Sequence, residues 1–284
     1  MCSAPVLCEK LEKLTDVLTG YGQMLIALSG GVDSVFLLTF ARNVLGGDSV
    51  AALTASGPHF APDEVQYAAH LCDCLGISHK IIKTDEILPL IEDNPLDRCY
   101  ICKKAIFSQL KERAEMTGST LADGTNLDDM DDYRPGHRAL QELEVASPLK
   151  DAGLTKAEIR DALKLMASED NSLAAALMLD SGMPIWEKPA FACLASRIPY
   201  GEKITCEKLN AVYRAEVFLH SIGFRQVRVR HHGDVARIEV LPGDRHRLFD
   251  EALMDRINNE ITSCGFRYAA LDLGGYKMGN LNKE

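Results

Sequence analysis

The sequence lacks any apolar run long enough to cross a bilayer, because its longest apolar runs fall well short of the ~20 residues that a spanning helix needs. Its first residues also lack the basic start and the long apolar core of a secretory signal. The chain contains no internal repeat and no low-complexity segment, and hydrophobic residues make up 46% of it. Together these features predict a globular cytoplasmic protein with a well-buried core.

Positive charge is in deficit, since 31 Lys and Arg residues stand against 41 Asp and Glu residues, for a net charge of -10. The electrostatic field of this net negative charge repels a polyphosphate backbone, so a nucleic-acid partner is disfavoured. Because the cytosol keeps thiols reduced, the nine cysteines are not expected to form a disulfide framework. Metal binding or sulfur chemistry is the better expectation for them.

Short apolar runs alternate with longer helical patterns through the first half of the chain. Strands are predicted at residues 24–28, 50–54, 79–84 and 120–122, and helices at 35–41, 62–75 and 100–116. A capping box formed by Thr155 and Glu158 predicts a further helix that runs to about Met166. This alternation predicts an α/β fold with a parallel sheet that binds ligands at the carboxyl ends of its strands.

The order of elements changes in the last third of the chain. Residues 187–203 carry two prolines and no clear period, which is typical of a loop between two domains. Helix, strand, strand, helix and strand then follow at 205–222, 225–231, 234–240, 245–263 and 267–273. We therefore predict a first domain at 1–186, a loop and linker at 187–204, and a smaller α+β domain at 205–284.

The segment Ser29–Ser34, with the sequence SGGVDS, lies where a strand gives way to a helix. Glycines let the backbone approach an anion closely, and the free amides and the macrodipole at a helix start favour negative charge. The serine hydroxyls add donors, while Asp33 is better placed to hold Mg²⁺ against a phosphate than to touch the phosphate. A glycine turn used only for packing is the simpler alternative. No GxxxxGK[ST] pattern occurs, which excludes a Walker-type loop.

The SGGVDS segment resembles the PP-loop of ATP pyrophosphatases, whose domain is adenine nucleotide alpha hydrolase-like. That resemblance implies that ATP is split between its α and β phosphates, with release of AMP and pyrophosphate. Further motifs are NPLDRCYICK at 94–103, GTNLDD at 124–129, YRPG at 133–136, SPL at 147–149 and ACLASRIPYG at 192–201. With these motifs, nearly the whole chain is similar to the LarE family of sulfur transferases, which mature the nickel-pincer nucleotide cofactor of lactate racemase.

The LarE resemblance implies a small-molecule substrate, a pyridinium mononucleotide with two carboxylates that become thiocarboxylates. ATP is needed because a carboxylate has no good leaving group, whereas an acyl adenylate releases AMP when sulfur attacks. Cys193 matches the sulfur-donating cysteine of the family, and the resemblance adds Ser196 and Arg197 to the catalytic set together with Asp33. For ATP and its Mg²⁺, the implied residues are Ser29, Gly30, Gly31, Asp33, Ser34, Gly124, Thr125, Asn126 and Asp129. A solvated acidic loop is the alternative for Asp129.

Cys99 and Cys102 form a CxxC, a spacing that metal and redox sites share with buried thiol pairs. With Cys193 they supply three thiolates, which can hold a 4Fe-4S cluster and leave one iron open to hydrosulfide. Sulfide or a sulfur-donor protein would then supply the sulfur. In the alternative, sacrificial route, Cys193 attacks the adenylate and C–S cleavage leaves dehydroalanine. The remaining cysteines match no motif and are expected in the core or on the surface: Cys2, Cys8, Cys72, Cys74, Cys206 and Cys264.

Arg228 and Arg230 alternate with valines, which places both arginines on one face of a predicted strand. Such a face could bind a phosphate bidentately. The LarE resemblance implies that this pair and Glu239 line the substrate-phosphate site near the subunit contacts of a homo-oligomer. A solvated, charged strand face is the alternative.

One departure from LarE-like chains is an apparent extra segment at 167–181, which could add a helix near the site or at an interface. The rival enzyme is a PP-loop tRNA thiolase, favoured by the three cysteines but opposed by the acidic charge and the lack of an obvious RNA-binding domain. A non-catalytic iron–sulfur or nucleotide sensor is a rival of another class, opposed by the intact SGGVDS.

Overall fold

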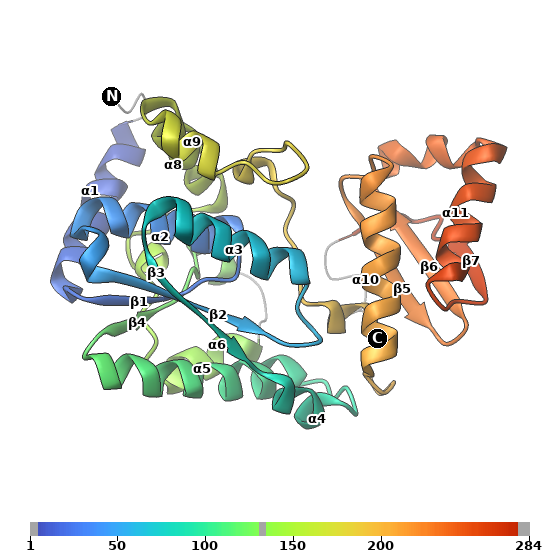
Figure 1. Cartoon of the computed structure of the whole chain (residues 1–284), viewed down its shortest axis with the longest axis horizontal. Coiled ribbons are helices and arrows are strands. Elements are labelled where there is room, and N and C mark those ends of the chain that lie inside the picture. The colour runs from blue at the N-terminus through green and yellow to red at the C-terminus, as the bar shows by residue number, and fades with distance from the viewer. Residues whose placement is uncertain (1–4, 131–134, 278–284) are drawn as a thin grey trace. The chain divides into compact units, whose positions relative to one another are not determined.

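The structure, a computed structural model, describes residues 5–130 and 135–277 of the chain (Figure 1). Cys2 and part of the motif at 133–136 therefore lie outside the described residues. The chain divides into two compact units, each assembled from several segments. The first unit contains Met1–Gly57, Pro62–Ile87 and Cys99–Ala190, and the second contains Pro58–Ala61, Leu88–Arg98 and Phe191–Glu284.

A four-stranded parallel sheet forms the centre of the first unit. Its strands are β1 (Met24–Ala27), β2 (Val50–Ser56), β3 (Ser78–Lys83) and β4 (Thr120–Ala122), in the order β3-β2-β1-β4. The register of β1 aligns Met24 with Val50 on one side and with Thr120 on the other. All four carboxyl ends therefore meet at one edge, and the predicted α/β fold with a parallel sheet is confirmed.

Helices cover both faces of this sheet, with α2 and α3 on one face and α5 on the other (Figure 1). They are α1 (Pro5–Tyr21), α2 (Val32–Leu45), α3 (Pro62–Leu75), α5 (Arg98–Thr117, starting at the unit boundary), α6 (Pro135–Glu142), α7 (Pro148–Asp151), α8 (Lys156–Glu169) and α9 (Asn171–Ala176). Single 3-10 turns are η1 (Gly47–Ser49), η2 (Asp85–Ile87), η3 (Leu127–Met130) and η4 (Ile185–Glu187). Phe36, Leu37 and Leu38 of α2 are fully buried, because α1 and α8 pack on the side of α2 that the sheet leaves open.

The predicted capping box at the start of α8 is present. The Glu158 amide donates to Thr155 Oγ1 over 3.4 Å, and the Thr155 amide donates to the Glu158 carboxylate over 2.8 Å. The apparent extra segment at 167–181 does contain a helix, α9, whose first amides are capped by Asp170. Since Leu173 is buried in the core of the first unit, this segment contributes to the packing of the unit.

The second unit contains a three-stranded sheet in the order β5-β6-β7. Strands β5 (Val227–His232) and β6 (Val235–Val240) pair antiparallel, while β7 (Tyr268–Leu271) lies parallel to β6. The helical elements are α4 (Leu88–Ile91), η5 (Leu194–Arg197), α10 (Cys206–Ser221), η6 (Pro242–Phe249) and α11 (Glu251–Ser263). The predicted helix at 245–263 is wrong in its first residues, because Asp250 is extended and caps α11 through the Leu253 amide. A smaller mixed α+β unit is therefore present.

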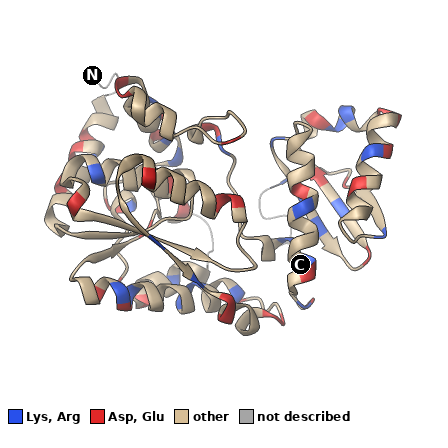
Figure 2. Cartoon of the chain, in the orientation of Figure 1, with Lys and Arg blue, Asp and Glu red and all other residues tan. Residues whose placement is uncertain are grey.

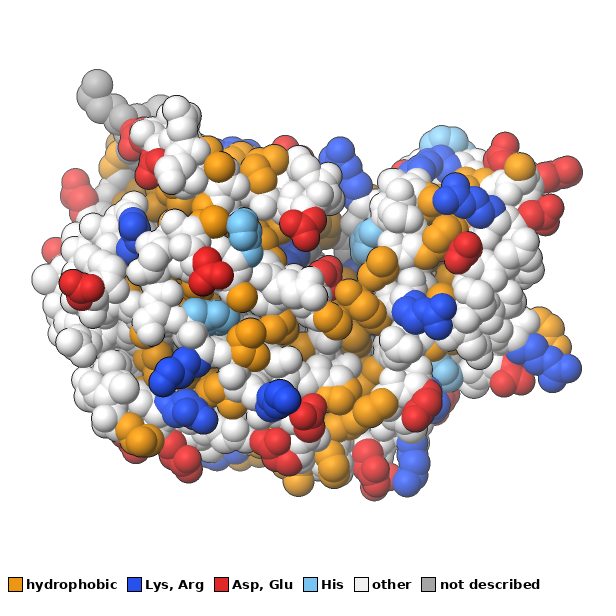
Figure 3. All heavy atoms as spheres, in the orientation of Figure 1, with side chains coloured by type: hydrophobic (Ala, Val, Ile, Leu, Met, Phe, Trp, Pro, Cys, Tyr) orange, Lys and Arg blue, Asp and Glu red, His pale blue; other side chains and the backbone are white. Residues whose placement is uncertain are grey.

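On the face drawn in Figure 2 and Figure 3, acidic and basic side chains are interspersed, and uncharged and hydrophobic atoms cover much of the area around them. Among the described residues, no helix has the length and apolar character that crossing a membrane requires.

Candidate active site

The SGGVDS segment forms a tight turn between β1 and α2, at the carboxyl edge of the sheet. Gly30 has a φ of +76°, and a Cβ at this position would lie 2.7 Å from the Glu64 carbonyl oxygen, so only glycine fits. The Ser34 hydroxyl donates to the Gly31 carbonyl over 3.0 Å and lies 3.1 Å from the Ser29 hydroxyl. No side chain caps the start of α2 in the described structure, which leaves amides there to bind an anion.

Asp33 and Asp129 share one electrostatic environment at this edge. Burial raises the pKa of Asp33 to about 6, and the charge of Asp129 adds to the rise, while Lys156, Arg160 and the Asn126 side chain oppose it. Asp129, in η3, is 6% exposed and pairs with Lys156 Nζ at 2.8 Å. A cation between two such carboxylates would relieve their repulsion, so the two predicted Mg²⁺ ligands fit the ion by their chemistry.

The GTN motif packs against the start of α2. A Cβ on Gly124 would lie 2.8 Å from the Ser34 amide nitrogen, so this glycine allows the close approach. Thr125 donates to Asp123, which also accepts a 2.8 Å bond from the Ser147 hydroxyl. The GTN residues therefore lie beside the phosphate turn, as expected for a segment that follows the strand next to β1.

Lys188 is a candidate that sequence reasoning missed. Its ammonium donates to the Gly30 carbonyl over 2.9 Å and pairs with Glu64 Oε1 at 2.9 Å. Arg160 of α8 positions this segment by donating to the backbone carbonyls of Trp186 and Lys188. Lys188 lies in an irregular stretch without periodicity, and only its Lys-Pro sequence could have drawn attention to it.

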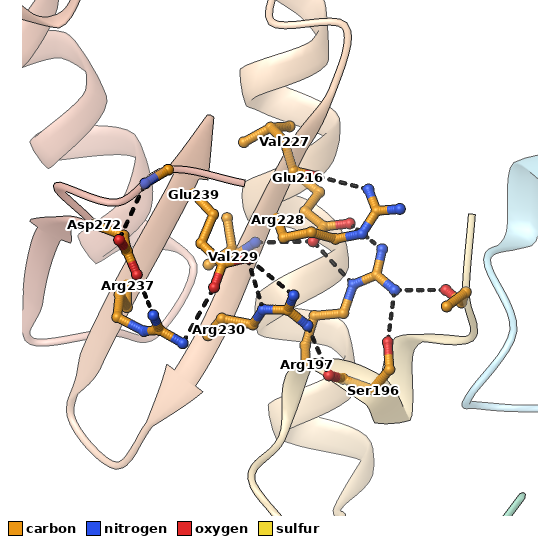
Figure 4. Close-up of polar contacts among 12 residues, drawn as sticks. Ser196, Arg197, Glu216, Val227, Arg228, Val229, Arg230, Arg237, Glu239 and Asp272 are labelled. Carbon is orange, nitrogen blue, oxygen red and sulfur yellow. Dashed lines mark hydrogen bonds and ion pairs between the residues drawn. The ribbon is translucent and has the colours of Figure 1, made fainter. Parts of the chain in front are cut away.

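The loop that carries Cys193 is organised by a buried arginine (Figure 4). Arg197 is fully buried, and its Nε and Nη2 donate to the two carboxylate oxygens of Glu216 over 2.9 and 2.7 Å. Its Nη1 donates to the Cys193 carbonyl over 3.2 Å and to the Ser196 hydroxyl over 3.0 Å. The donors of Arg197 are thus engaged within the protein, which indicates a positioning residue for the Cys193 loop.

Loss of Glu216 should therefore destabilise the second unit. Its carboxylate also accepts from the Val229 amide over 2.9 Å, so Glu216→Ala leaves Nε and Nη2 of Arg197 and a backbone amide buried without their acceptor. Breaking a buried pair in this way costs roughly 3–5 kcal/mol in the free energy of unfolding. Urea unfolding monitored by circular dichroism measures the loss. Glu202→Ala, at a partly exposed ion pair of the same unit, is the control and should cost below about 1 kcal/mol.

The NPLDR motif holds the segment that follows Cys193. The Asn94 side-chain nitrogen donates to the carbonyls of Ile198, over 3.1 Å, and Pro199, and the Gly201 amide donates back to the Asn94 carbonyl over 3.0 Å. The Arg98 guanidinium donates to Asn94 and lies 4.4 Å from the centre of the Tyr200 ring. Two motifs that are far apart in the sequence are thus joined within the second unit.

The arginines predicted on β5 are buried, so the alternative of a solvated strand face is wrong: Arg228 is 4% exposed and Arg230 is 6% exposed. Arg230 donates twice to Glu239 Oε2, over 3.1 and 2.9 Å, and once to the Ser196 carbonyl over 2.9 Å (Figure 4). Val227 and Val229, which alternate with the arginines, are fully buried as well, which means that both faces of β5 are covered.

Arg228 is held between two aromatic rings, with its guanidinium 5.1 Å from the Phe191 ring centre and 5.3 Å from that of Tyr276. Burial lowers the pKa of Arg228 to about 10, and the neighbouring charge of Arg197 adds to the fall. Among the described residues, the guanidinium groups of Arg197, Arg228, Arg230 and Arg237 face the carboxylates of Glu216, Glu239 and Asp272 (Figure 4). Each carboxylate of this cluster is thus paired with at least one guanidinium group.

The three cysteines of interest are divided between the units. Cys99 is exposed and Cys102 is half-buried, three residues apart on one face of α5, while half-buried Cys193 precedes η5 in the second unit. No group of three or more His, Cys, Asp or Glu side chains in the described parts of the chain is already arranged around a metal position. Cys72 is a core residue, and burial raises the pKa of its thiol to about 12.

A cavity of about 360 Å³ lies at the opposite edge of the first sheet. Gln23, Ser49 and Ser119 line it, next to the amino ends of the strands. Ligands of parallel sheets bind at the carboxyl ends, where the SGGVDS and GTN segments lie. We therefore place the candidate active site at the carboxyl edge.

Known proteins resemble this chain over most of its length. The NAD synthase family matches residues 7–118, a range that includes SGGVDS. An uncharacterized protein of Synechocystis sp. is 38% identical over 280 residues, 98% of each chain. The pyridinium-3,5-bisthiocarboxylic acid mononucleotide synthase of Lactiplantibacillus plantarum is 36% identical over 278 residues, 97% of this chain and 95% of that one. A solved glutamine-dependent NAD+ synthetase from Acinetobacter baumannii, in complex with adenosine diphosphate, matches with a TM-score of 0.49, 20% identity, and coverage of 60% of this chain and 35% of that chain.

Proposed function

Because this chain belongs to the LarE family, we propose that it is an ATP-dependent sulfur transferase that converts the carboxylates of a pyridinium biscarboxylate mononucleotide to thiocarboxylates. The observation that carries the proposal is the SGGVDS turn, with uncapped amides at the start of α2 and Asp33 beside Asp129. Such a turn suits a nucleotide phosphate chain with its Mg²⁺. The relative in Lactiplantibacillus plantarum, matched over 97% of this chain, supports the substrate class.

In the first step, a substrate carboxylate oxygen attacks the α-phosphorus of ATP and the bond to the β-phosphate bridge breaks. The products are an acyl adenylate and pyrophosphate. The residues of this chain that would bind the nucleotide are Ser29, Gly30, Gly31, Ser34, Gly124, Thr125 and Asn126. Asp33 and Asp129 would hold Mg²⁺, which neutralises the phosphate charge that develops as pyrophosphate leaves.

In the second step, a sulfur nucleophile attacks the acyl carbon and AMP leaves. For this chain we infer that Cys99, Cys102 and Cys193 hold a 4Fe-4S cluster, because the three are thiols in two matched motifs. When bound, a cluster with three protein ligands supplies an open iron that can carry hydrosulfide. Arg197 and Ser196 keep the Cys193 loop in place by the contacts of their side chains and carbonyls.

The alternative second step uses the sulfur of Cys193 itself. Its thiolate attacks the acyl carbon, AMP leaves and a thioester forms, and removal of the Cys193 α-proton then cleaves its C–S bond. The substrate departs as thiocarboxylate and the protein retains dehydroalanine. Each chain could act only once in this route.

Product analysis tests the first step. Incubation with ATP, Mg²⁺ and the mononucleotide under anaerobic conditions should form AMP and pyrophosphate in a substrate-dependent reaction. ADP and phosphate as the main products would contradict the proposal. Activation by tRNA in place of the mononucleotide would support the tRNA thiolase instead, and the lack of any AMP would support a sensor. The homo-oligomer and the cytoplasmic location stay predictions.

We also expect the Arg228 and Arg230 cluster, with Glu239, to bind the phosphate of the mononucleotide. A charge-assisted hydrogen bond contributes roughly 1.5–3 kcal/mol, so Arg228→Ala should weaken binding of the mononucleotide about tenfold or more. Binding of ATP should hardly change. Isothermal titration calorimetry with each ligand checks this, and Arg256→Ala on α11 is the matched control. Equal losses for both ligands in Arg228→Ala would show a structural role.

A further inference from the structure

Lys188 lies against the phosphate turn although it is 158 residues away from Gly30 in the sequence. Its ammonium contacts the Gly30 carbonyl and the Glu64 carboxylate, both at 2.9 Å, and its side chain is 14% exposed. Arg160 fixes the backbone on which Lys188 stands, with a 2.8 Å bond from Nη2 to the Lys188 carbonyl. The lysine is therefore held at the turn before any nucleotide arrives.

The SGGVDS turn contains no cation of its own. A Walker-type loop includes a lysine that reaches the β- and γ-phosphates, whereas this turn offers amides, two hydroxyls and an acidic Asp33. Asp33, Asp129 and Glu64 all add negative charge at this edge, which opposes binding of a polyphosphate. Lys156 and Arg160 act electrostatically on Asp33, and among the described residues Lys188 is the cation that donates a hydrogen bond to the backbone of the turn itself.

Resting on the proposed function, we propose that Lys188 binds the β- and γ-phosphates of ATP and stabilises pyrophosphate as it leaves, and that Glu64 is its counterion in the free enzyme. Negative charge increases on the pyrophosphate oxygens while the bond to the α-phosphorus breaks, so a fixed ammonium lowers the energy of that transition state. The phosphates replace the Glu64 carboxylate and the Gly30 carbonyl as acceptors for the three N–H donors of the lysine.

A purely structural ion pair makes a different prediction from a phosphate ligand. If the ion pair of Lys188 and Glu64 only holds α3 against residues 185–188, loss of either partner should change phosphate binding at the turn in the same direction. If Lys188 binds phosphate, loss of its charge weakens binding, whereas loss of the Glu64 charge removes both a competitor and a source of repulsion. The two substitutions then act in opposite directions.

Calorimetric titration of the full chain with magnesium pyrophosphate separates these cases. Lys188→Met should weaken pyrophosphate binding about tenfold or more, as expected for a lost charge-assisted hydrogen bond. Glu64→Gln should bind pyrophosphate at least as tightly as the unaltered protein. Lys10→Ala is the matched control, because it breaks a 2.7 Å ion pair of similar burial with Glu158 in the same unit and should leave the affinity unchanged. The rate of AMP formation at saturating ATP should fall in Lys188→Met.

Thermal unfolding checks that each variant is folded, and Lys188→Arg, which retains the charge, should restore most of the affinity if Lys188→Met folds poorly. Weaker binding in both Lys188→Met and Glu64→Gln, or unchanged binding in Lys188→Met, overturns the role of Lys188 while leaving the proposed function intact. Failure of the unaltered protein to bind either ATP or pyrophosphate would overturn both.

Discussion

Asp33→Ala is expected to lower the rate of AMP formation by roughly 100-fold or more. Bound Mg²⁺ lowers the energy of the charged transition state by several kcal/mol, and this substitution removes one of the carboxylates that would hold the ion. Asp33 lies in the first turn of α2 and interacts electrostatically with Asp129, so these two carboxylates would hold the cation that neutralises phosphate charge. Measurement of AMP and pyrophosphate over time, with saturating mononucleotide, gives the rate.

The matched control is Asp48→Ala, which removes an acidic residue of the same unit beside the cavity at the amino edge of the sheet. That variant should turn over ATP at the rate of the unaltered protein. If Asp33→Ala retains most of its activity, Asp33 does not hold the ion on which the reaction depends, and the predicted Mg²⁺ site is wrong.

Stability provides a second readout for Asp33. Burial raises its pKa from 3.8 to about 6, so between these values the folded chain binds more protons than the unfolded chain. The free energy of unfolding therefore decreases as pH rises from 3.8 to about 6. Above pH 6 Asp33 is charged in the folded chain, and its buried charge destabilises the fold. Asp33→Asn should raise the free energy of unfolding at pH 7 by roughly 1–3 kcal/mol, and the difference should vanish near pH 3. Activity and stability then change in opposite directions.

Local patterns made much of the first unit predictable from the sequence. The strand at Thr120–Ala122 and the helix at Pro62–Leu75 have the predicted bounds, because apolar runs and an initial proline act over a few residues. The capping box is equally local. By contrast, the predicted start of the last helix at residue 245 was wrong, because Pro242–Phe249 forms a 3-10 segment and the extended Asp250 separates it from α11.

Long-range contacts account for what sequence reasoning missed at the candidate site. Lys188 belongs to an irregular segment, and its neighbour Gly30 lies in a different part of the chain. Alternation along β5 left a solvated charged face open as an alternative, but strand β6 supplies the Glu239 carboxylate that allows Arg230 to be buried. A single strand pattern carries no information about such a partner, whereas a motif such as SGGVDS contains its main contacts within six residues.

The same limit applies to the cysteines. Spacing identifies Cys99 and Cys102 as a pair on one helix face, and the LarE resemblance adds Cys193. Whether the three thiols come close to one another depends on long-range contacts, which no short motif contains. Asn94 and Arg98, which precede Cys99, do hold the residues that follow Cys193 through side-chain and backbone hydrogen bonds. That link supports a shared role for the two motifs.

Anaerobic reconstitution with iron and sulfide is therefore expected to load about four iron atoms per chain, with the visible absorbance of a 4Fe-4S cluster. Replacement of Cys99, Cys102 or Cys193 by Ala should lower the iron content severalfold, because a cluster held by two thiolates is poorly retained. Cys74→Ala and Cys206→Ala, which remove exposed cysteines of the first and second units, should leave the iron content unchanged. The loaded protein should complete many turnovers when sulfide is supplied.

Mass spectrometry of the protein after turnover distinguishes this route from the sacrificial one. If an added sulfur is transferred, Cys193 survives and the mass of the chain is unchanged after removal of the cluster. In the sacrificial route, conversion of Cys193 to dehydroalanine lowers the mass by about 34 Da, in step with the sulfur transferred. Arg197 is 0% exposed and its Nη1 holds the Cys193 carbonyl, so the Cys193 backbone is fixed in either case and only the fate of the sulfur differs. A stoichiometric mass loss, together with a reconstituted chain that binds no iron through these cysteines, would show that Cys193 is the donor and that the cluster proposal is wrong.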